Sequence, residues 1–203
     1  MTLNKEDVRR QIVEIAGTLI EQGGSGALQV RAIARQAGIS VGSVYNIVGD
    51  IDALHRMVNV GLLDELGMAG VETSRRLREE GVTDVRQRLL ALAETYLAFV
   101  ERNHAKWNAL LAFNRSRPTA EMPDWYMARQ EMLFGIIAEV LADTALGRDD
   151  QRRQTAARAL WSAVHGIVTN SFVGRSDKTH ADESRAQIDL LVSVFVHGLE
   201  AEA

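Results

Sequence analysis

Apolar residues recur every three or four positions along almost the whole chain, a spacing that places them on one face of an α-helix. No segment shows the alternation of a half-buried β-strand, and only Pro118 and Pro123 interrupt the pattern as prolines. The chain is therefore predicted to be all-α. The predicted helices cover approximately Lys5–Gln22, Val30–Ala37, Val41–Val48, Ile51–Glu80, Asp84–Arg102, His104–Arg115, Asp124–Leu146, Asp150–Val173 and Ala181–Glu200.

The two short predicted helices, Val30–Ala37 and Val41–Val48, are separated by a tight turn. Gly38 tolerates the left-handed backbone that ends a helix, and the hydroxyl of Ser40 can cap the helix that follows. Apolar residues of both helices, Val44 among them, are spaced to pack together. This is the pattern of a helix-turn-helix, whose second helix enters the major groove of DNA.

The rest of the chain is expected to have a different role. Tyr45 is the only aromatic residue before residue 96, and the other ten follow it. We predict a headpiece at residues 1–50 and a helical domain at 51–203, which has the aromatic material for a pocket or a large interface. A long polar helix from Ile51 connects them. Three positions where it is expected to bend or break are Gly61, Gly67 and Gly70.

Composition narrows the class of protein. The 203 residues are 46% hydrophobic and 25% charged, and no apolar run approaches the roughly 18 residues of a membrane span. The N-terminus lacks the features of a secretory signal, and the absence of cysteine rules out disulfides and Cys-based zinc sites. We therefore expect a cytoplasmic protein without membrane association.

Charge gives no support for nucleic-acid binding. The net charge is −4, and residues 1–55 hold five Lys and Arg against six Asp and Glu. A basic domain, the usual footprint of phosphate binding, is absent. The DNA-binding prediction therefore depends on the geometry of the turn.

The turn also resembles a known family. The residues Ile33-Ala34, Ala37-Gly38-Ile39-Ser40-Val41-Gly42-Ser43-Val44-Tyr45 and Ala53-Leu54 are similar in type and spacing to the headpiece of the TetR family of bacterial one-component regulators. The resemblance extends from the first helix to the start of the fourth. It implies that the residues facing DNA phosphates are Gln29, Arg31, Ser40, Ser43 and Tyr45, and that those nearest the bases are Val41, Gly42 and Asn46.

Two of these positions suit direct reading of bases. Asn46 can bind adenine through two hydrogen bonds, and Val41 can contact a thymine methyl group. The alternatives are that Val41 belongs to the core and that Tyr45 only supports the turn.

The headpiece departs from the family pattern at several positions. Ile47 and Val48 stand where two aromatic residues are usual, and Ile51 stands where a phosphate-contacting Lys is common. Gln29 replaces a frequent Thr and is a poor helix cap. The missing cation at Ile51 should weaken non-specific DNA affinity.

A second resemblance lies near the C-terminus. The segment 159–168, with Trp161, His165 and Gly166, resembles the penultimate helix of one C-terminal class of the same family. The resemblance implies a homodimer in which the last two helices form a four-helix bundle with their symmetry mates, with Gly166 allowing close approach. Two headpieces roughly 34–36 Å apart would select a pseudopalindromic operator in double-stranded DNA. Apolar residues expected to contribute are Ile188, Leu191, Val192, Phe195 and Leu199.

The resemblance further implies repression that a small ligand relieves by tilting the connector. Candidate residues for binding a small apolar or aromatic effector are Trp107, Phe113, Trp125, Phe134 and His165. Asn114, Arg115 or His165 is available to fix one polar group of the ligand. The alternative is that these aromatic residues form an ordinary core.

Other chemistry is not expected. The five histidines lack metal-ligand spacing, so neither a metal nor another cofactor is predicted. Gly38–Gly42 matches the G-x-S-x-G pattern of hydrolases, but that motif needs a preceding β-strand, and the preceding residues have a helical pattern. The main hypothesis is a ligand-responsive DNA-binding regulator, not an enzyme. The alternative is a helical ligand-binding or protein-interaction dimer that has lost DNA binding.

Overall fold

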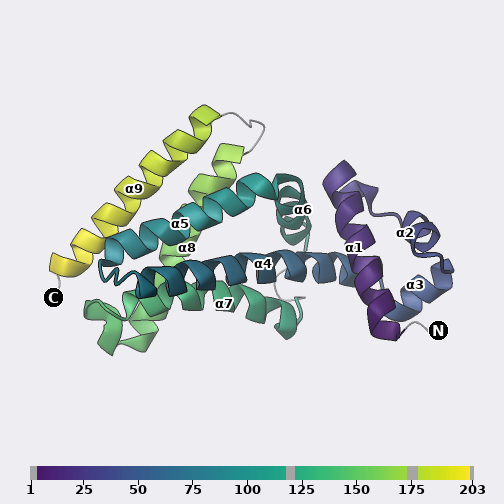
Figure 1. The fold of residues 1–203 in the computed structure, drawn as a ribbon, viewed down its shortest axis with the longest axis horizontal. Coiled ribbons are helices and arrows are strands. Elements are labelled where there is room, and N and C mark those ends of the chain that lie inside the picture. The colour runs from purple at the N-terminus through teal and green to yellow at the C-terminus, as the bar shows by residue number, and fades with distance from the viewer. Residues whose placement is uncertain (1–3, 118–121, 173–177, 202–203) are drawn as a thin grey trace. The chain divides into compact units, whose positions relative to one another are not determined.

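The computed structural model of the chain describes residues 4–117, 122–172 and 178–201. Helices make up almost all of these residues and no strand occurs among them, which confirms the all-α prediction (Figure 1). Contacts divide the chain into two compact units. The first comprises Met1–Asp64 and Asn103–Met127, and the second comprises Glu65–Arg102 and Ala128–Ala203.

The predicted helices are found with small changes at their ends. The α-helices are α1 (Lys5–Gly23), α2 (Val30–Ala37), α3 (Val41–Val48), α4 (Ile51–Glu79), α5 (Val85–Arg102), α6 (His104–Arg115), α7 (Asp124–Leu141), α8 (Asp150–Phe172) and α9 (Lys178–Ala201). Two 3₁₀ turns are η1 (Ser25–Ala27) and η3 (Ala145–Arg148).

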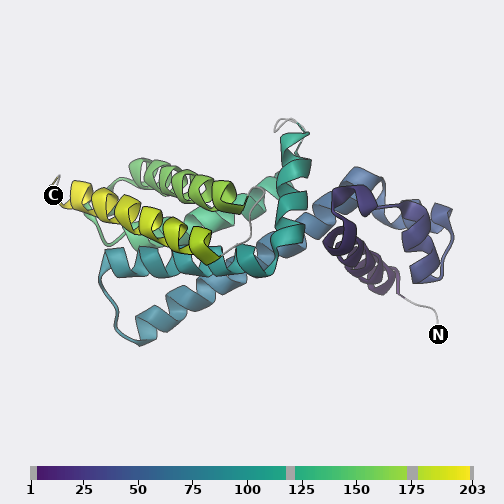
Figure 2. The ribbon, with the colours of Figure 1, turned by 90° about the horizontal axis from the view of Figure 1, so that it is seen from above.

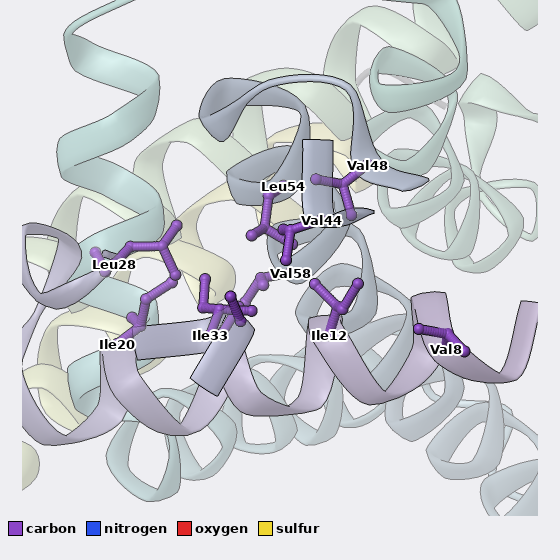
Figure 3. Packing of buried hydrophobic residues seen from close by; sticks show 12 residues of the cluster. Val8, Ile12, Ile20, Leu28, Ile33, Val44, Val48, Leu54 and Val58 are labelled. Atoms are coloured by element: carbon purple, nitrogen blue, oxygen red, sulfur yellow. The ribbon is translucent and has the colours of Figure 1, made fainter. Parts of the chain in front are cut away.

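The first unit is built around one apolar core (Figure 3). α1 contributes a row at every fourth position, which includes the fully buried Ile12. Ile33 of α2 and Val44 of α3 are also fully buried, and Leu54 extends the core into the start of α4. Each such side chain removed from water stabilises the unit by about 1.5–3 kcal/mol, so α2 and α3 are held in place by the same small set of aliphatic contacts.

In the second unit, α4 lies close to α7 through two glycines. A Cβ at Gly67 would lie 2.3 Å from Cε of Met132, and one at Gly70 would lie 3.2 Å from Cδ1 of Ile136. The helix does not break at its glycines, because it is continuous from Ile51 to Glu79. The physical reason is packing, since Gly67 and Gly70 allow close approach between α4 and α7.

The end of α7 also differs from the prediction. The helix ends at Leu141 instead of Leu146, and a 3₁₀ turn follows. The Thr144 side chain accepts a hydrogen bond from the Leu146 backbone N–H at 3.2 Å, and Leu146 is buried. Sequence periodicity continues through this turn because Leu146 has the spacing of a helical core residue but reaches the core from the turn. α9 begins three residues before its predicted start, at Lys178.

The contact-based units do not follow the predicted domain boundary at residue 50. The first unit contains the start of α4 and all of α6, which is far away in the sequence. Because the units are defined by packing and the boundary is defined by function, the boundary at residue 50 stays a prediction. None of the described helices combines the length and apolarity needed to cross a bilayer.

Two glycines of the second unit should respond oppositely to alanine. In Gly147→Ala the new Cβ would lie 2.2 Å from the Ala142 backbone oxygen, so we expect a loss of about 1–3 kcal/mol from overpacking. In Gly135→Ala the new Cβ meets no atom within 4 Å at an exposed position of α7, so we expect a gain of about 0.5–1 kcal/mol. Thermal denaturation of the full chain measures both. Equal effects would contradict the packing described for the turn after α7.

Candidate DNA-binding site

The turn between α2 and α3 is set by one glycine. Gly38 adopts φ 68° and ψ 29°, the left-handed region, which side chains other than that of glycine rarely enter. The N–H of Ile39 then donates to the carbonyl of Ala34 at 3.0 Å, and the N–H of Gly38 donates to that of Arg35 at 3.4 Å. These bonds satisfy carbonyls that α2 would leave unpaired and fix the exit direction of the chain.

α3 begins with a side-chain cap. The Ser40 Oγ accepts a hydrogen bond from the Ser43 backbone N–H at 3.0 Å and lies 2.8 Å from the Ser43 hydroxyl. This confirms the predicted cap and places the two hydroxyls together at the helix start. At the start of α2, Gln29 makes no side-chain capping hydrogen bond, and its side chain is exposed.

The two faces of α3 are sharply different. Val44 is fully buried and Val48 is 5% exposed, whereas Val41 is 38% and Tyr45 is 45% exposed. Gly42 and Asn46 are also exposed, and Ser43 is partly exposed. Val41 is therefore not a core residue, and the ring of Tyr45 is open to solvent. All eight predicted DNA-contact positions lie at the surface of the first unit.

Few free cations accompany this face. Arg31 and Arg35 lie four residues apart on α2 and are exposed, and among the described residues neither has a carboxylate partner. On α1, Arg9 pairs with Glu6 at 2.9 Å and Arg10 pairs with an acidic neighbour. The helix-turn-helix therefore presents a lightly charged surface.

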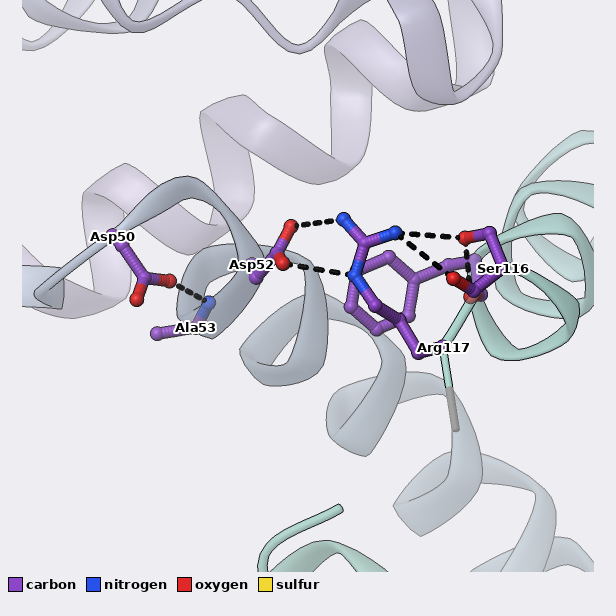
Figure 4. Close-up of polar contacts among 6 residues, drawn as sticks. Asp50, Asp52, Ala53, Ser116 and Arg117 are labelled. Carbon is purple, nitrogen blue, oxygen red and sulfur yellow. Dashed lines mark hydrogen bonds and ion pairs between the residues drawn. The ribbon is translucent and has the colours of Figure 1, made fainter. Parts of the chain in front are cut away.

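The start of α4 is tied to the end of α6 by an ion pair (Figure 4). Nε and Nη2 of Arg117 donate to the two carboxylate oxygens of Asp52 at 2.9 and 2.7 Å. This hydrogen bond holds the pKa of Asp52 below its usual value. The same guanidinium lies 5.1 Å from the centre of the Phe113 ring, and Asp50 caps α4 by accepting from the Ala53 N–H at 2.6 Å.

A buried tyrosine of α7, Tyr126, also links α4 to α6. The Tyr126 hydroxyl donates to Oδ1 of Asn114 at 3.0 Å and lies 3.5 Å from Nδ2 of Asn59. Burial raises the pKa of Tyr126. His55 is 8% exposed and stacks on Phe113, with ring centres 4.9 Å apart. Sequence reasoning missed this network, because its partners lie up to 67 residues apart and only the acidic residues at the start of α4 were a local signal.

The five predicted effector residues are divided between the two units. Trp107, Phe113 and Trp125 belong to the first unit, while Phe134 and His165 belong to the second. Trp107 and Phe113 are buried in packing, and Trp125 is 49% exposed. Trp107 and Phe113 therefore fit the alternative in which these aromatic residues form an ordinary core.

The second unit contains a cavity of about 60 Å³. Its wall is almost entirely apolar and includes two aromatic residues, Tyr96 and Trp161. Phe134 and His165 do not line it but adjoin these two: Phe134 meets Trp161 edge to face at 5.9 Å, and the Tyr96 hydroxyl lies 2.8 Å from Nδ1 of His165. The other lining residues are Leu66, Gly70, Leu89, Leu92, Ala93, Thr95, Leu133, Ile136, Ile137, Leu160, Val164 and Val192. Sequence reasoning looked for aromatic residues and missed a mainly aliphatic wall.

Comparison with known proteins settles the family. A family model described as the tetracyclin repressor-like C-terminal domain matches residues 89–195, more than half of the chain. The chain belongs to the TetR family.

Individual relatives agree with this assignment. An uncharacterized HTH-type transcriptional regulator of Mycobacterium tuberculosis is 27% identical over 175 residues, which cover 86% of this chain and 74% of the relative. Among solved structures, PfmR of Thermus thermophilus superposes with a TM-score of 0.62 at 20% identity, covering 90% of this chain and 97% of that one. A TetR regulator of Haloarcula marismortui gives 0.68 at 18% identity, covering 96% and 98%.

Membership of the TetR family confirms the main prediction at a coarse level. The protein is a DNA-binding transcriptional regulator and not an enzyme. Its fold, with a helical headpiece and a helical C-terminal part, matches that of solved TetR-family structures.

The burial of His55 predicts a pH dependence of stability. Burial lowers the pKa of His55 below its usual value of 6.5, so the unfolded chain takes up the proton first as the pH falls. The stability that the neutral, buried His55 contributes is complete above about pH 6.5 and is lost as the pH falls toward the folded-state pKa. We expect His55→Gln to reduce the fall in melting temperature between pH 7.5 and 5.5.

An identical pH dependence in His55→Gln and the natural protein would contradict the neutral, buried state assigned to His55.

Proposed function

We propose that this TetR-family protein is a repressor that binds a pseudopalindromic operator as a homodimer and is released by a small apolar ligand. The observation that carries the proposal is the two-sided character of α3. Val44 and Val48 fasten it to the core, and its opposite face is exposed beside a defined turn. A short helix presented in this way suits entry into the major groove.

The proposed contacts follow from exposure and chemistry. Phosphate contacts are assigned to donors around the turn, and base contacts to the middle of the exposed face of α3. The phosphate-facing residues are Gln29, Arg31, Ser40, Ser43 and Tyr45. The residues nearest the bases are Val41, Gly42 and Asn46.

The proposed dimer interface is formed by α8 and α9, which lie side by side in the second unit (Figure 2). Ile188 and Val192 are buried within their own unit, so they are not available to a partner as the sequence analysis expected. Leu190 and Val194 of α9 are instead 67% and 64% exposed. Gly166 of α8 faces open space, where an added Cβ would meet no atom within 4 Å, and leaves room for a partner helix.

The effector site is proposed at the apolar cavity of the second unit. Its wall offers few polar atoms, and those of Thr95 and Tyr96 already have hydrogen-bond partners in Thr73 and His165. A charged ligand group would be buried there without compensation. Phe134 and His165 do not line the cavity, and they would influence ligand binding through their contacts with Trp161 and Tyr96.

Operator binding is tested by fluorescence anisotropy of the full chain with its own upstream intergenic duplex and with a scrambled duplex. We expect preference for the natural duplex, and Tyr45→Ala should weaken that binding about 10-fold by removing a phosphate contact. Val71→Ala, at an exposed position of α4, is the control and should bind normally. Equal, weak binding to both duplexes would support the alternative of a dimer that has lost DNA binding.

Ligand response is tested with 1-hexanol as an apolar probe. It should raise the melting temperature and lower operator affinity together, because a ligand stabilises the state that it binds. Ala93→Val narrows the cavity and should remove both effects, whereas Ala138→Val adds the same volume at a buried position that does not line it. Stabilisation without loss of DNA affinity would show that the cavity is not an effector site.

A further inference from the structure

The exposed face of α3 carries no positive charge. Its exposed residues are Val41, Gly42, Tyr45 and Asn46. The commonest specific contact to guanine is a Lys or Arg that donates to O6 and N7, and α3 contains neither residue. The donors and apolar groups that it does present suit adenine and thymine instead.

We propose that α3 reads A·T base pairs, with Asn46 on adenine, Val41 on a thymine methyl group and closest approach at Gly42. This inference rests on the proposed operator binding and specifies the sequence that is read. Asn is the side chain that pairs with N6 and N7 of adenine, and an exposed aliphatic group suits the thymine methyl. Guanine presents two acceptors, O6 and N7, in the major groove, so the carbonyl oxygen of Asn46 would face an acceptor and lack a donor.

The spacing of these residues limits the length of the site. Asn46 lies five residues after Val41, about 7.5 Å along the helix axis. With base pairs about 3.4 Å apart, this distance corresponds to about two base-pair steps. Each headpiece therefore reads two or three A·T pairs through α3.

Gly42 supplies an independent argument for close contact. A Cβ at this position would meet only the Ser40 Oγ, at an ordinary 3.8 Å, and the backbone is not in the left-handed region. Glycine inside a helix lowers helix stability, so the fold itself would favour alanine here. Close approach of DNA to the bare backbone gives the position a reason to lack a side chain.

The free cations of the headpiece lie outside α3. Arg31 and Arg35 extend from α2, not from α3. We assign them to phosphates, where a cation strengthens binding to every sequence equally. The rival assignment, guanine reading by Arg31, predicts a different operator and a different mutant phenotype.

Selection of duplexes from a randomised pool by the full-length protein tests the proposal. We expect two or three adjacent A·T positions in each half-site. Asn46→Ala should weaken binding to the selected duplex about 5- to 150-fold and lose discrimination at one adenine, while Arg31→Ala should weaken all duplexes without changing the preference. Guanine at these positions, with discrimination lost in Arg31→Ala, would overturn the proposal. Absence of any selected sequence would instead overturn operator binding itself.

Gly42→Ala separates the structural and functional roles of the glycine. We expect a melting temperature equal to or above that of the natural protein, together with at least a 10-fold loss of affinity for the selected duplex. Gly61→Ala on α4 is the matched control, since its Cβ also meets open space, and it should bind DNA normally. Normal DNA binding by Gly42→Ala, or a lower melting temperature, would contradict close approach at this position.

Discussion

An isolated helix of eight residues is not stable in water, and α3 has only that length. Its structure depends on burial of Val44 and Val48 in the core of the first unit, together with the left-handed turn at Gly38 and the cap at Ser40. These inward contacts occupy one side of the helix. Only a narrow outward face is left for DNA, and in this chain that face is uncharged.

The same core explains why the first unit includes parts distant in sequence. α6 joins it through Ala109, and the Asp52–Arg117 ion pair and the Tyr126 network fix the start of α4, which follows α3. Apolar packing gives the unit its stability, and the hydrogen bonds and charges select one arrangement of α4 and α6. In the second unit, the polar groups at the cavity wall are likewise paired, which leaves an apolar space.

Local features of the sequence predicted the turn, its cap and most helix ends, because glycine, serine and apolar spacing act over a few residues. Features set by distant partners were not predictable in this way. Gly67 and Gly70 looked like weak points in a helix but allow contact with α7. The aromatic residues suggested a pocket, whereas the cavity is formed mainly by aliphatic side chains from helices that only the folded chain brings together.

The central claim is that a lightly charged helix-turn-helix recognises DNA by shape and hydrogen bonding with few ionic contacts. The salt dependence of operator binding by the full-length dimer tests it most directly. Each headpiece has three exposed cations without an ion-pair partner among the described residues, namely Lys5, Arg31 and Arg35. A plot of log K against log salt concentration should therefore have a slope of about −5 or shallower. A slope of about −8 or steeper would contradict the account, because it would require phosphate contacts from cations that this surface does not present.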